Sequence, residues 1–274
     1  MQLVDSHAHL DFEDFHGDFD AVLKRAEEAK ISKIINIGAS LERSRTTVLL
    51  AENYENIFAV VGVHPEESDE INFDTIHDEL IDLAKSSPKV VGIGETGLDY
   101  YRLGGTDLRG MTRAVMTDSE KKNQINLFQI HIDVARHLGL PLVIHIRNGE
   151  DEEAVNTVYE TLKDSGYTKG VIHCFTLNAD WAKRFVKLGF FLGFTGIITY
   201  KNAEVIRDAV AATPLENILV ETDSPFLAPQ KYRGQRNEPA FTIEVAKKIS
   251  EIKEITLEKV SEQTTINVRK LFNV

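Results

Sequence analysis

The stretch VDSHAHLDF (residues 4–12) places two histidines two positions apart at the end of an apolar, β-rich run. In a strand, side chains at positions i and i+2 point to the same face, so we expect His7 and His9 to lie side by side. Two imidazoles on one face are typical ligands of a transition metal, although hydrogen-bonded histidines of a half-buried strand give the same pattern. The stretch alone leaves both interpretations open.

Similar β-rich runs recur along the chain, and helical patterns separate them. Including the first, the runs cover residues 3–9, 33–38, 57–63, 89–95, 141–146, 170–175, 189–196 and 217–223. Most are almost continuously apolar, as parallel strands covered on both faces require. One-sided apolar stripes, typical of helices, cover residues 18–30, 41–53, 118–138, 151–164, 178–188, 203–211, 240–251 and 257–272. The alternation predicts an α/β fold, a single-domain (β/α)8 TIM barrel over residues 1–274, with a doubly wound open sheet as the alternative.

Composition narrows the class of protein. A net charge of −12 argues against non-specific coating of nucleic acid, but it permits an enzyme that holds nucleic acid through metal ions and a few local cations. Cys174 is the single cysteine, and no apolar run approaches the ~20 residues that span a bilayer. We therefore expect a cytoplasmic protein with no membrane association and no obligate protein partner.

Ligand-type residues recur where the strand-like runs end. Glu95 ends the fourth run, His145 and His173 lie at the ends of the fifth and sixth, and Asp223 ends the eighth. In a closed barrel these ends converge on one mouth. Each residue alone is usually a satisfied core group, but histidines and carboxylates that meet in one buried patch need a cation to offset their desolvation. Together with the first two histidines they predict a two-metal site with ions ~3.5–4 Å apart.

Several motifs also resemble, in order, those of the TatD family of metal-dependent deoxyribonucleases. They are VDSHAHLD, GVHP, GETGLDYYR, LPLVIHIR, IHCF, LGFTG, LVETDSP and RGQRNEP, and the tail TTINVRKLF resembles that family's closing helix. The resemblance implies an amidohydrolase-type barrel and a Mg²⁺- or Mn²⁺-dependent nuclease that acts on DNA ends. It implies that one metal is held by His7, His9, Glu95 and Asp223, and a second by Glu95, His145 and His173. Glu95 then bridges the ions, whereas many related barrels use a carboxylated lysine as the bridge. A glutamate bridge favours the nucleases among these barrels over the small-molecule amidohydrolases.

The expected activity is hydrolysis of phosphodiester bonds in DNA, as a 3′→5′ exonuclease that uses a metal-activated water. Glu95 and Asp223 are the predicted catalytic residues: Glu95 touches both ions, and Asp223 orients the attacking water or takes its proton. The mixed histidine and carboxylate ligands suit Mn²⁺ or Zn²⁺ better than Mg²⁺. One alternative is a small-molecule amidohydrolase or phosphoesterase on the same metals. Another is an inactive scaffold that binds nucleic acid or protein.

We predict that His64, Arg147, Arg233 and Arg236 contact the substrate phosphates. A guanidinium matches a phosphate with two hydrogen bonds, which favours the arginines. His64 lies at the end of the third run and either contacts the phosphate or braces a metal ligand. Each has a structural alternative. His64 is a histidine in a turn, and Arg147 forms a surface ion pair. Arg233 and Arg236 lie in a loop where Asn237 caps the next helix.

Other residues near the strand ends have supporting roles in this interpretation. We expect Asp99 to support a metal-ligating histidine, and Phe12, Phe15 and Tyr200 to pack rather than to stack on bases. The segment 101–119 is rich in glycine and arginine and longer than a routine loop. Since a loop after the fourth strand lies on the catalytic face of a barrel, we expect a lid rather than a disordered surface excursion.

Overall fold

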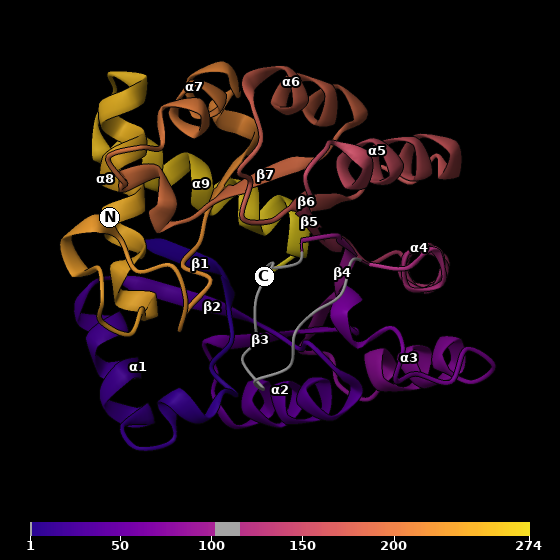
Figure 1. Ribbon diagram of the computed structural model, residues 1–274. Helices are drawn as coiled ribbons and strands as arrows, with labels where there is room; N and C mark the ends of the chain where they lie inside the picture. The colour runs from indigo at the N-terminus through magenta and orange to yellow at the C-terminus, as the bar shows by residue number, and fades with distance from the viewer. Residues whose placement is uncertain (1, 102–115) are drawn as a thin grey trace.

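The computed structural model describes residues 2–101 and 116–274, so most of the segment predicted to be a lid lies outside the described residues. Eight parallel strands form one sheet, and their spatial order follows the chain (Figure 1). The strands are β1 (Leu3–Ala8), β2 (Ile31–Ile37), β3 (Ile57–Val61), β4 (Val90–Asp99), β5 (Leu142–Arg147), β6 (Gly170–Ile172), β7 (Phe191–Phe194) and β8 (Ile218–Val220). A doubly wound sheet reverses its strand order at a switch point. The observed order excludes that alternative and confirms the predicted (β/α)8 barrel.

The barrel closes where β1 meets the segment after β8. The backbone N–H of Asp223 donates to the carbonyl of His7 at 2.9 Å. Asp5 strengthens the same seam, because its carboxylate accepts from both the backbone N–H and the hydroxyl of Thr222, at 2.9 and 2.6 Å. The seam holds the first histidine motif beside the residues that follow β8.

Helices surround the sheet as an outer ring (Figure 1). They are α1 (Phe19–Glu28), α2 (Leu41–Asn53), α3 (Ile76–Lys85), α4 (Asp118–Leu138), α5 (Glu153–Ser165), α6 (Ala179–Leu188), α7 (Glu204–Ala212), α8 (Thr242–Lys253) and α9 (Leu257–Phe272). The sequence patterns predict every one of them except α3. That helix buries Ile76, Leu80 and Ala84, a stripe no narrower than that of α1, which buries Val22 and Ala26. Within residues 2–101 and 116–274, no helix is long and apolar enough to cross a membrane.

Local sequence signals set the ends of α4, the longest of these helices. The hydroxyl of Thr117 accepts from the backbone N–H of Glu120 at 3.2 Å, and the carboxylate of Glu120 accepts from the N–H of Thr117 at 2.6 Å. This reciprocal capping box satisfies donors that the first helical turn leaves unpaired. At the other end, Gly139 adopts a left-handed conformation with φ of 67°, which terminates the helix.

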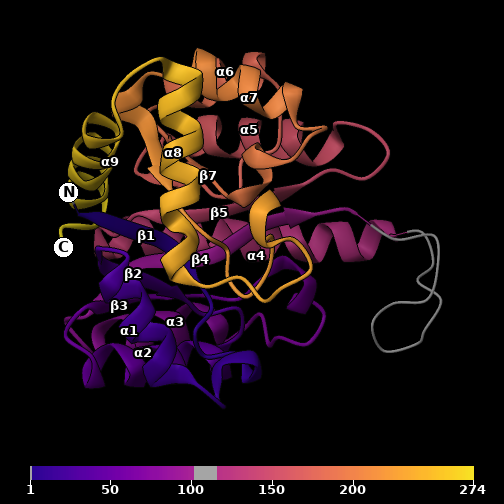
Figure 2. The ribbon, with the colours of Figure 1, turned by 90° about the vertical axis from the view of Figure 1, so that its left-hand side faces the viewer.

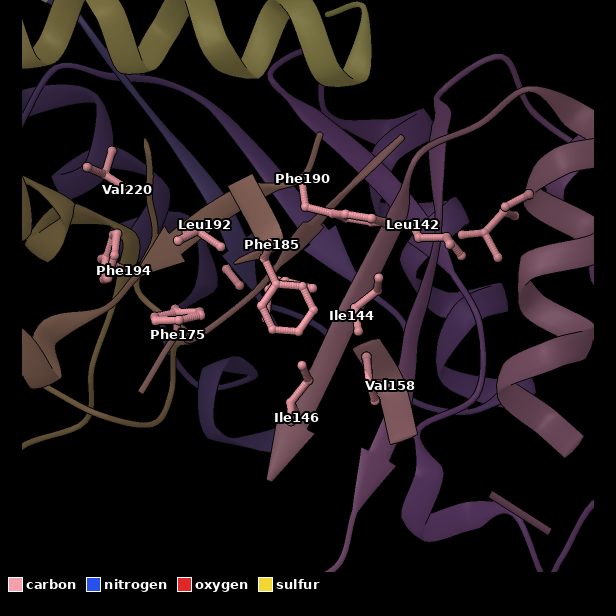
Figure 3. Close-up of a cluster of buried hydrophobic side chains, with 14 of the residues drawn as sticks. Leu142, Ile144, Ile146, Val158, Phe175, Phe185, Phe190, Leu192, Phe194 and Val220 are labelled. Carbon is pink, nitrogen blue, oxygen red and sulfur yellow. The ribbon is translucent and has the colours of Figure 1, made fainter. Parts of the chain in front are cut away.

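Apolar side chains pack in two layers, one outside the sheet and one inside the barrel. On the outside, Phe185 of α6 and Val158 of α5 pack near Ile144 and Ile146 of β5 (Figure 3). The inside layer lies toward the amino ends of the strands, the left-hand side of Figure 2, where both termini also lie. It consists of one or two residues from each strand and the last turn of α9: Val4, Ile35, Ile37, Val60, Val91, Val143, Val171, Phe191, Leu219, Val268, Leu271 and Phe272. The barrel is therefore filled with apolar groups at one end.

Strand alternation then places polar groups above this apolar layer. His145 lies two residues after Val143, and His173 lies two residues after Val171. Since side chains two apart share a face, both imidazoles point into the barrel on its carboxyl side. On β5 and at the end of β6 the inner face thus changes from apolar residues to a ligand-type histidine.

β4 differs from its predicted extent. The apolar pattern stops at Glu95, but the strand continues to Asp99, so the prediction that Glu95 ends the fourth strand was wrong. The extension is possible because residue 97 is a glycine. Gly97 has a φ of 128° and pairs with His145 of β5 so closely that a side chain at position 97 would collide with that strand. A Cβ at Gly97 would lie 2.1 Å from the carbonyl oxygen of His145. The longer strand brings Asp99 beside β5.

Candidate metal centre

The two histidines of the first motif converge, as their spacing predicts. Their Nε2 atoms lie 3.1 Å apart, and both residues are buried. Glu95 Oε2 lies 3.6 Å from the Nε2 of each, and Asp223 Oδ1 lies 3.5 Å from His7 and 3.4 Å from His9. Two ligands of one ion bound at ~2.1 Å stand ~3.0 to 3.4 Å apart, depending on the coordination geometry. These separations are at or slightly above that range. The ligand atoms of His7, His9 and Glu95 form one group that could hold an ion, and those of His7, His173 and Asp223 form another.

A second group of ligand atoms gathers around the other oxygen of Glu95. Oε1 lies 2.7 Å from His173 Nε2 and 3.0 Å from His145 Nδ1, and those two nitrogens are 3.2 Å apart. One carboxylate thus faces the imidazoles of His145 and His173 with Oε1, and those of His7 and His9 with Oε2. This is the arrangement that a carboxylate bridging two ions requires.

Hydrogen bonds outside the cluster fix which ring nitrogens are available. His9 Nδ1 lies 2.9 Å from the carbonyl oxygen of Ile37, an acceptor, so this nitrogen carries the proton and Nε2 presents its lone pair. His145 Nε2 lies 3.0 Å from Asp99 Oδ2, so this nitrogen donates and Nδ1 presents its lone pair to Glu95. Metal-ligating histidines are held in this way by carbonyls and carboxylates. Lone pairs and carboxylate oxygens meet at one place, where a cation satisfies them all, so the donor set fits a divalent metal.

Protons and divalent cations compete for these lone pairs. Burial lowers the pKa of His9, but Asp223 and Glu95 outweigh it and raise that pKa to about 9. Asp99 and Glu95 likewise overcome burial and raise the pKa of His145 to about 10. Burial would raise the pKa of Glu95, yet the surrounding histidines hold it well below its usual range, so the carboxylate is ionised. The cluster therefore attracts positive charge, either as protons on the histidines or as divalent cations.

Glu221 is a site residue that the sequence interpretation missed. It is fully buried, its Oε1 lies 3.8 Å from His173 Nδ1, and it accepts from the backbone N–H of Cys174 and the hydroxyl of Ser6. A signal was present: Glu221 follows Leu219 by two positions, and Leu219 belongs to the inner apolar layer. Alternation therefore points Glu221 into the barrel as well.

Of the predicted phosphate ligands, His64 and Arg147 lie at the mouth. His64 Nε2 is 3.7 Å from Glu95 Oε1, and the ligand-type atoms of His64, Glu95 and His145 lie close together. Arg147 ends β5, and its guanidinium lies 3.8 Å above the ring of Tyr101.

Arg233 and Arg236 lie in the loop after β8 and have other contacts. Arg233 stacks on the ring of Tyr200 at 4.6 Å. Arg236 donates to both carboxylate oxygens of Asp18, at 2.7 and 2.8 Å, and so joins this loop to the start of α1. The alternative in which Asn237 caps the next helix was wrong, because the N-cap of the short helix that follows is Glu238 and no side chain caps it. Tyr200 thus holds Arg233, and Asp18 holds Arg236.

Other aromatic residues of the mouth agree with the packing expectation in part. Phe15 is fully buried, and the hydroxyl of Tyr200 donates to the carbonyl of Ala228 at 2.9 Å. Phe12 is only half-buried and lies 5.0 Å from the ring of His9.

Comparison with known proteins decides the family. The family model for TatD-related DNases matches residues 4–273. The chain belongs to the TatD family. It is 34% identical to the uncharacterized metal-dependent hydrolase YabD of Bacillus subtilis, over 99% of both chains. It is 35% identical to the uncharacterized metal-dependent hydrolase YcfH of Escherichia coli K12, over 100% of this chain and 97% of YcfH.

Solved structures give the same family. The chain superposes on YjjV, a TatD homologue from Escherichia coli, with a TM-score of 0.87 and 30% identity, over 99% of this chain and 98% of YjjV. A hydrolase TatD family protein from Entamoeba histolytica superposes with a TM-score of 0.83 and 25% identity, over 99% and 98%. The TatD resemblance of the sequence motifs is thus confirmed, and the protein is a metal-dependent hydrolase.

Proposed function

We propose that this TatD-family protein is a deoxyribonuclease that hydrolyses phosphodiester bonds and removes nucleotides from the 3′ end of DNA. The observation that carries the proposal is the convergence of Glu95 with imidazole lone pairs from β1, β5 and the end of β6. A phosphodiester is an anion, and its cleavage needs positive charge at the mouth of a protein whose net charge is −12. The match to the model of TatD-related DNases supports DNA as the substrate.

In this proposal two divalent ions, Mg²⁺, Mn²⁺ or Zn²⁺, are the cofactors. Their ligands are His7, His9, Glu95 and Asp223 for one ion, and Glu95, His145 and His173 for the other. When bound, such a pair would lower the pKa of the attacking water and neutralise the charge that develops on the phosphate. The imidazole-rich set favours Mn²⁺ or Zn²⁺ over Mg²⁺, which prefers oxygen ligands.

The two carboxylates have different tasks. Both oxygens of Glu95 face histidines, so this residue holds the two halves of the centre together. Asp223 directs Oδ1 to His7 and His9, which leaves its second oxygen to orient the attacking water and accept its proton. The neighbouring histidines hold the pKa of Asp223 below its usual value despite burial, so it enters the reaction as the ionised base.

His64 is placed to donate to a phosphate oxygen. Its Nδ1 accepts from the backbone N–H of Glu66 at 3.2 Å, so Nε2 carries the proton and points toward Glu95. Burial and the nearby His145 lower the pKa of His64 to about 4, so the ring is neutral at pH 7 and serves as a hydrogen-bond donor rather than as a base. Arg147 and Arg233 supply positive charge to the phosphates on either side of the scissile bond.

The test is hydrolysis of 5′-labelled single- and double-stranded DNA with Mg²⁺, Mn²⁺ and Zn²⁺ added separately, and with EDTA as a blank. We expect a metal-dependent ladder that shortens from the 3′ end and is lost in Glu95→Gln. Glu160→Gln is the matched control, because Glu160 is an exposed residue of α5 that pairs with Lys163. Intact DNA with every metal would contradict the proposal and favour a small-molecule ester or amide as the substrate.

A further inference from the structure

Phe226 is an exposed aromatic residue at the mouth of the barrel. It follows Asp223 by three positions in the loop after β8, and 49% of its surface is exposed. The other large exposed apolar residues in the described part of the chain, Leu49, Val205 and Ile266, lie on outer helices. A single exposed apolar residue needs no explanation by itself. Phe226 differs because hydrogen bonds hold its backbone and because its ring contacts the rings of His9 and Phe12.

The backbone of this loop is firmly held, so the exposure of the ring does not come from a loose segment. The N–H of Phe226 donates to the carbonyl of Asp223 at 2.9 Å. The carbonyl of Phe226 accepts from Asn237 Nδ2 at 2.6 Å, and the same amide nitrogen donates to the carbonyl of Thr222 at 2.8 Å. Since Asn237 is fully buried, it fixes Phe226 relative to the proposed metal ligand Asp223.

The ring of Phe226 continues an aromatic surface that starts at the cluster. It lies 6.4 Å from the ring of His9 and 5.7 Å from that of Phe12, both in T-shaped contact. Phe12 in turn lies 5.0 Å from His9, and the guanidinium of Arg43 lies 4.0 Å over the ring of Phe12. Arg43 is itself bound to the buried carboxylate of Asp11 at 3.2 Å. We call Phe12 and Phe226 the aromatic shelf.

We propose that the aromatic shelf stacks the unpaired base of the nucleotide whose phosphate lies at the cluster. This inference rests on the proposed nuclease function. A phosphate placed against His9 puts its own base one sugar away, and the ring of Phe226 lies at that range from His9 on the solvent side. Stacking on an aromatic ring accepts any base, because every base has a π-face.

The shelf has a consequence for substrate choice. A base can reach Phe226 only when it leaves its own stack and partner, so single-stranded or frayed ends are the preferred substrates. Loss of one base–aromatic contact weakens binding by about ten-fold, in the lower part of the range found for alanine substitution in single-strand binders.

The test compares two oligonucleotides that differ only at the 3′-terminal nucleotide, which carries a base in one and a base-free tetrahydrofuran ring in the other. Binding is measured by fluorescence anisotropy with the active metal present, on versions of both oligonucleotides whose terminal linkage is a hydrolysis-resistant phosphorothioate. The kinetic constants kcat and KM are measured with the same metal on the ordinary phosphodiesters. The variants are Phe226→Ala, Phe226→Trp and, as a control of similar exposed apolar area, Ile266→Ala.

For wild type and Ile266→Ala we expect the normal end to bind about ten-fold more tightly than the base-free end. Phe226→Ala should lose this preference, with a raised KM and little change in kcat for the normal end, and Phe226→Trp should restore it. Equal affinity of wild type for both ends would overturn the shelf while leaving DNA hydrolysis intact. An equal loss of affinity for the normal and the base-free oligonucleotide in Phe226→Ala would also overturn it. If wild type neither binds nor cleaves either oligonucleotide, the nuclease proposal itself fails.

Discussion

Asp99→Asn is predicted to weaken one of the two proposed metal sites without disturbing the other. In the structure, Asp99 Oδ2 accepts from His145 Nε2 and Oδ1 accepts from the backbone N–H of Tyr101, both at 3.0 Å. Asparagine has one acceptor oxygen and one donor nitrogen, so it can satisfy only one of these two donors. If its oxygen turns to Tyr101, its NH₂ group faces His145 and forces the proton onto Nδ1, the atom that faces Glu95.

The size of the effect follows from the role of such supporting carboxylates. Their loss costs 10- to 100-fold in metal affinity, or about 1.4 to 2.8 kcal/mol. Asp99 is buried, and His145 holds its pKa below the usual value in spite of that burial. The carboxylate is therefore ionised in the native protein, and the substitution also removes a negative charge beside the site.

The assay is competition for Mn²⁺ or Zn²⁺ between the protein and a chromophoric chelator, which resolves two binding steps. We expect one step to weaken by 10- to 100-fold and the step that belongs to His7 and His9 to stay within a factor of about two. Asp133→Asn, an exposed residue of α4 that pairs with Arg136, is the control. Wild-type affinity for both ions in Asp99→Asn would refute the reasoning, and so would equal weakening of both steps in a variant with an unchanged melting temperature.

Four further substitutions test other parts of the account. His131 is buried with a pKa lowered by burial from 6.5 to about 4, so it contributes stability above pH 6.5 that is lost as the pH falls toward 4, up to about 3 kcal/mol. In urea unfolding, His131→Gln should flatten this fall, and an unchanged pH profile would contradict it. Gly193→Ala should destabilise the protein by ~1–3 kcal/mol in thermal melts, because its Cβ would lie 2.2 Å from the carboxylate of Glu221; a wild-type melting temperature would be inconsistent with that contact. Arg147→Ala should raise KM for DNA several-fold at constant stability, whereas Arg236→Ala, which breaks the pair with Asp18, should lower the melting temperature and leave KM unchanged; the reverse pattern would exchange their roles.

The barrel could be predicted because its signals are local. Each strand is a short apolar run and each helix a one-sided stripe, so alternation along the chain gives the topology without knowledge of any distant contact. α3 was missed although its buried stripe resembles those of helices that were predicted. β4 was predicted too short because Glu95, Thr96 and Gly97 interrupt the apolar pattern. The pairing of Gly97 with His145, which extends that strand, is a contact between strands.

The candidate ligands could be predicted for a related reason. A closed barrel brings the carboxyl ends of all its strands to one mouth, so ligand-type residues at those ends must meet. The supporting residues depend on contacts that one sequence does not reveal. Glu221 bonds to the backbone N–H of Cys174, 47 positions away, and Arg236 pairs with Asp18 across 218 positions. Residue type alone therefore suggested phosphate binding for Arg236, while its partner is the carboxylate of Asp18, just before α1.

The central claim is that Glu95 bridges two divalent ions in this protein. Anomalous scattering from crystals soaked in Mn²⁺ tests it most directly, because it locates each ion independently of activity. The account predicts two peaks ~3.5–4 Å apart, one between His7 and His9 and one between His145 and His173, with a Glu95 oxygen against each. It also predicts that both peaks weaken or vanish in Glu95→Gln. A fully occupied pair of ions in Glu95→Gln, or no ion among these histidines in wild type, would contradict it.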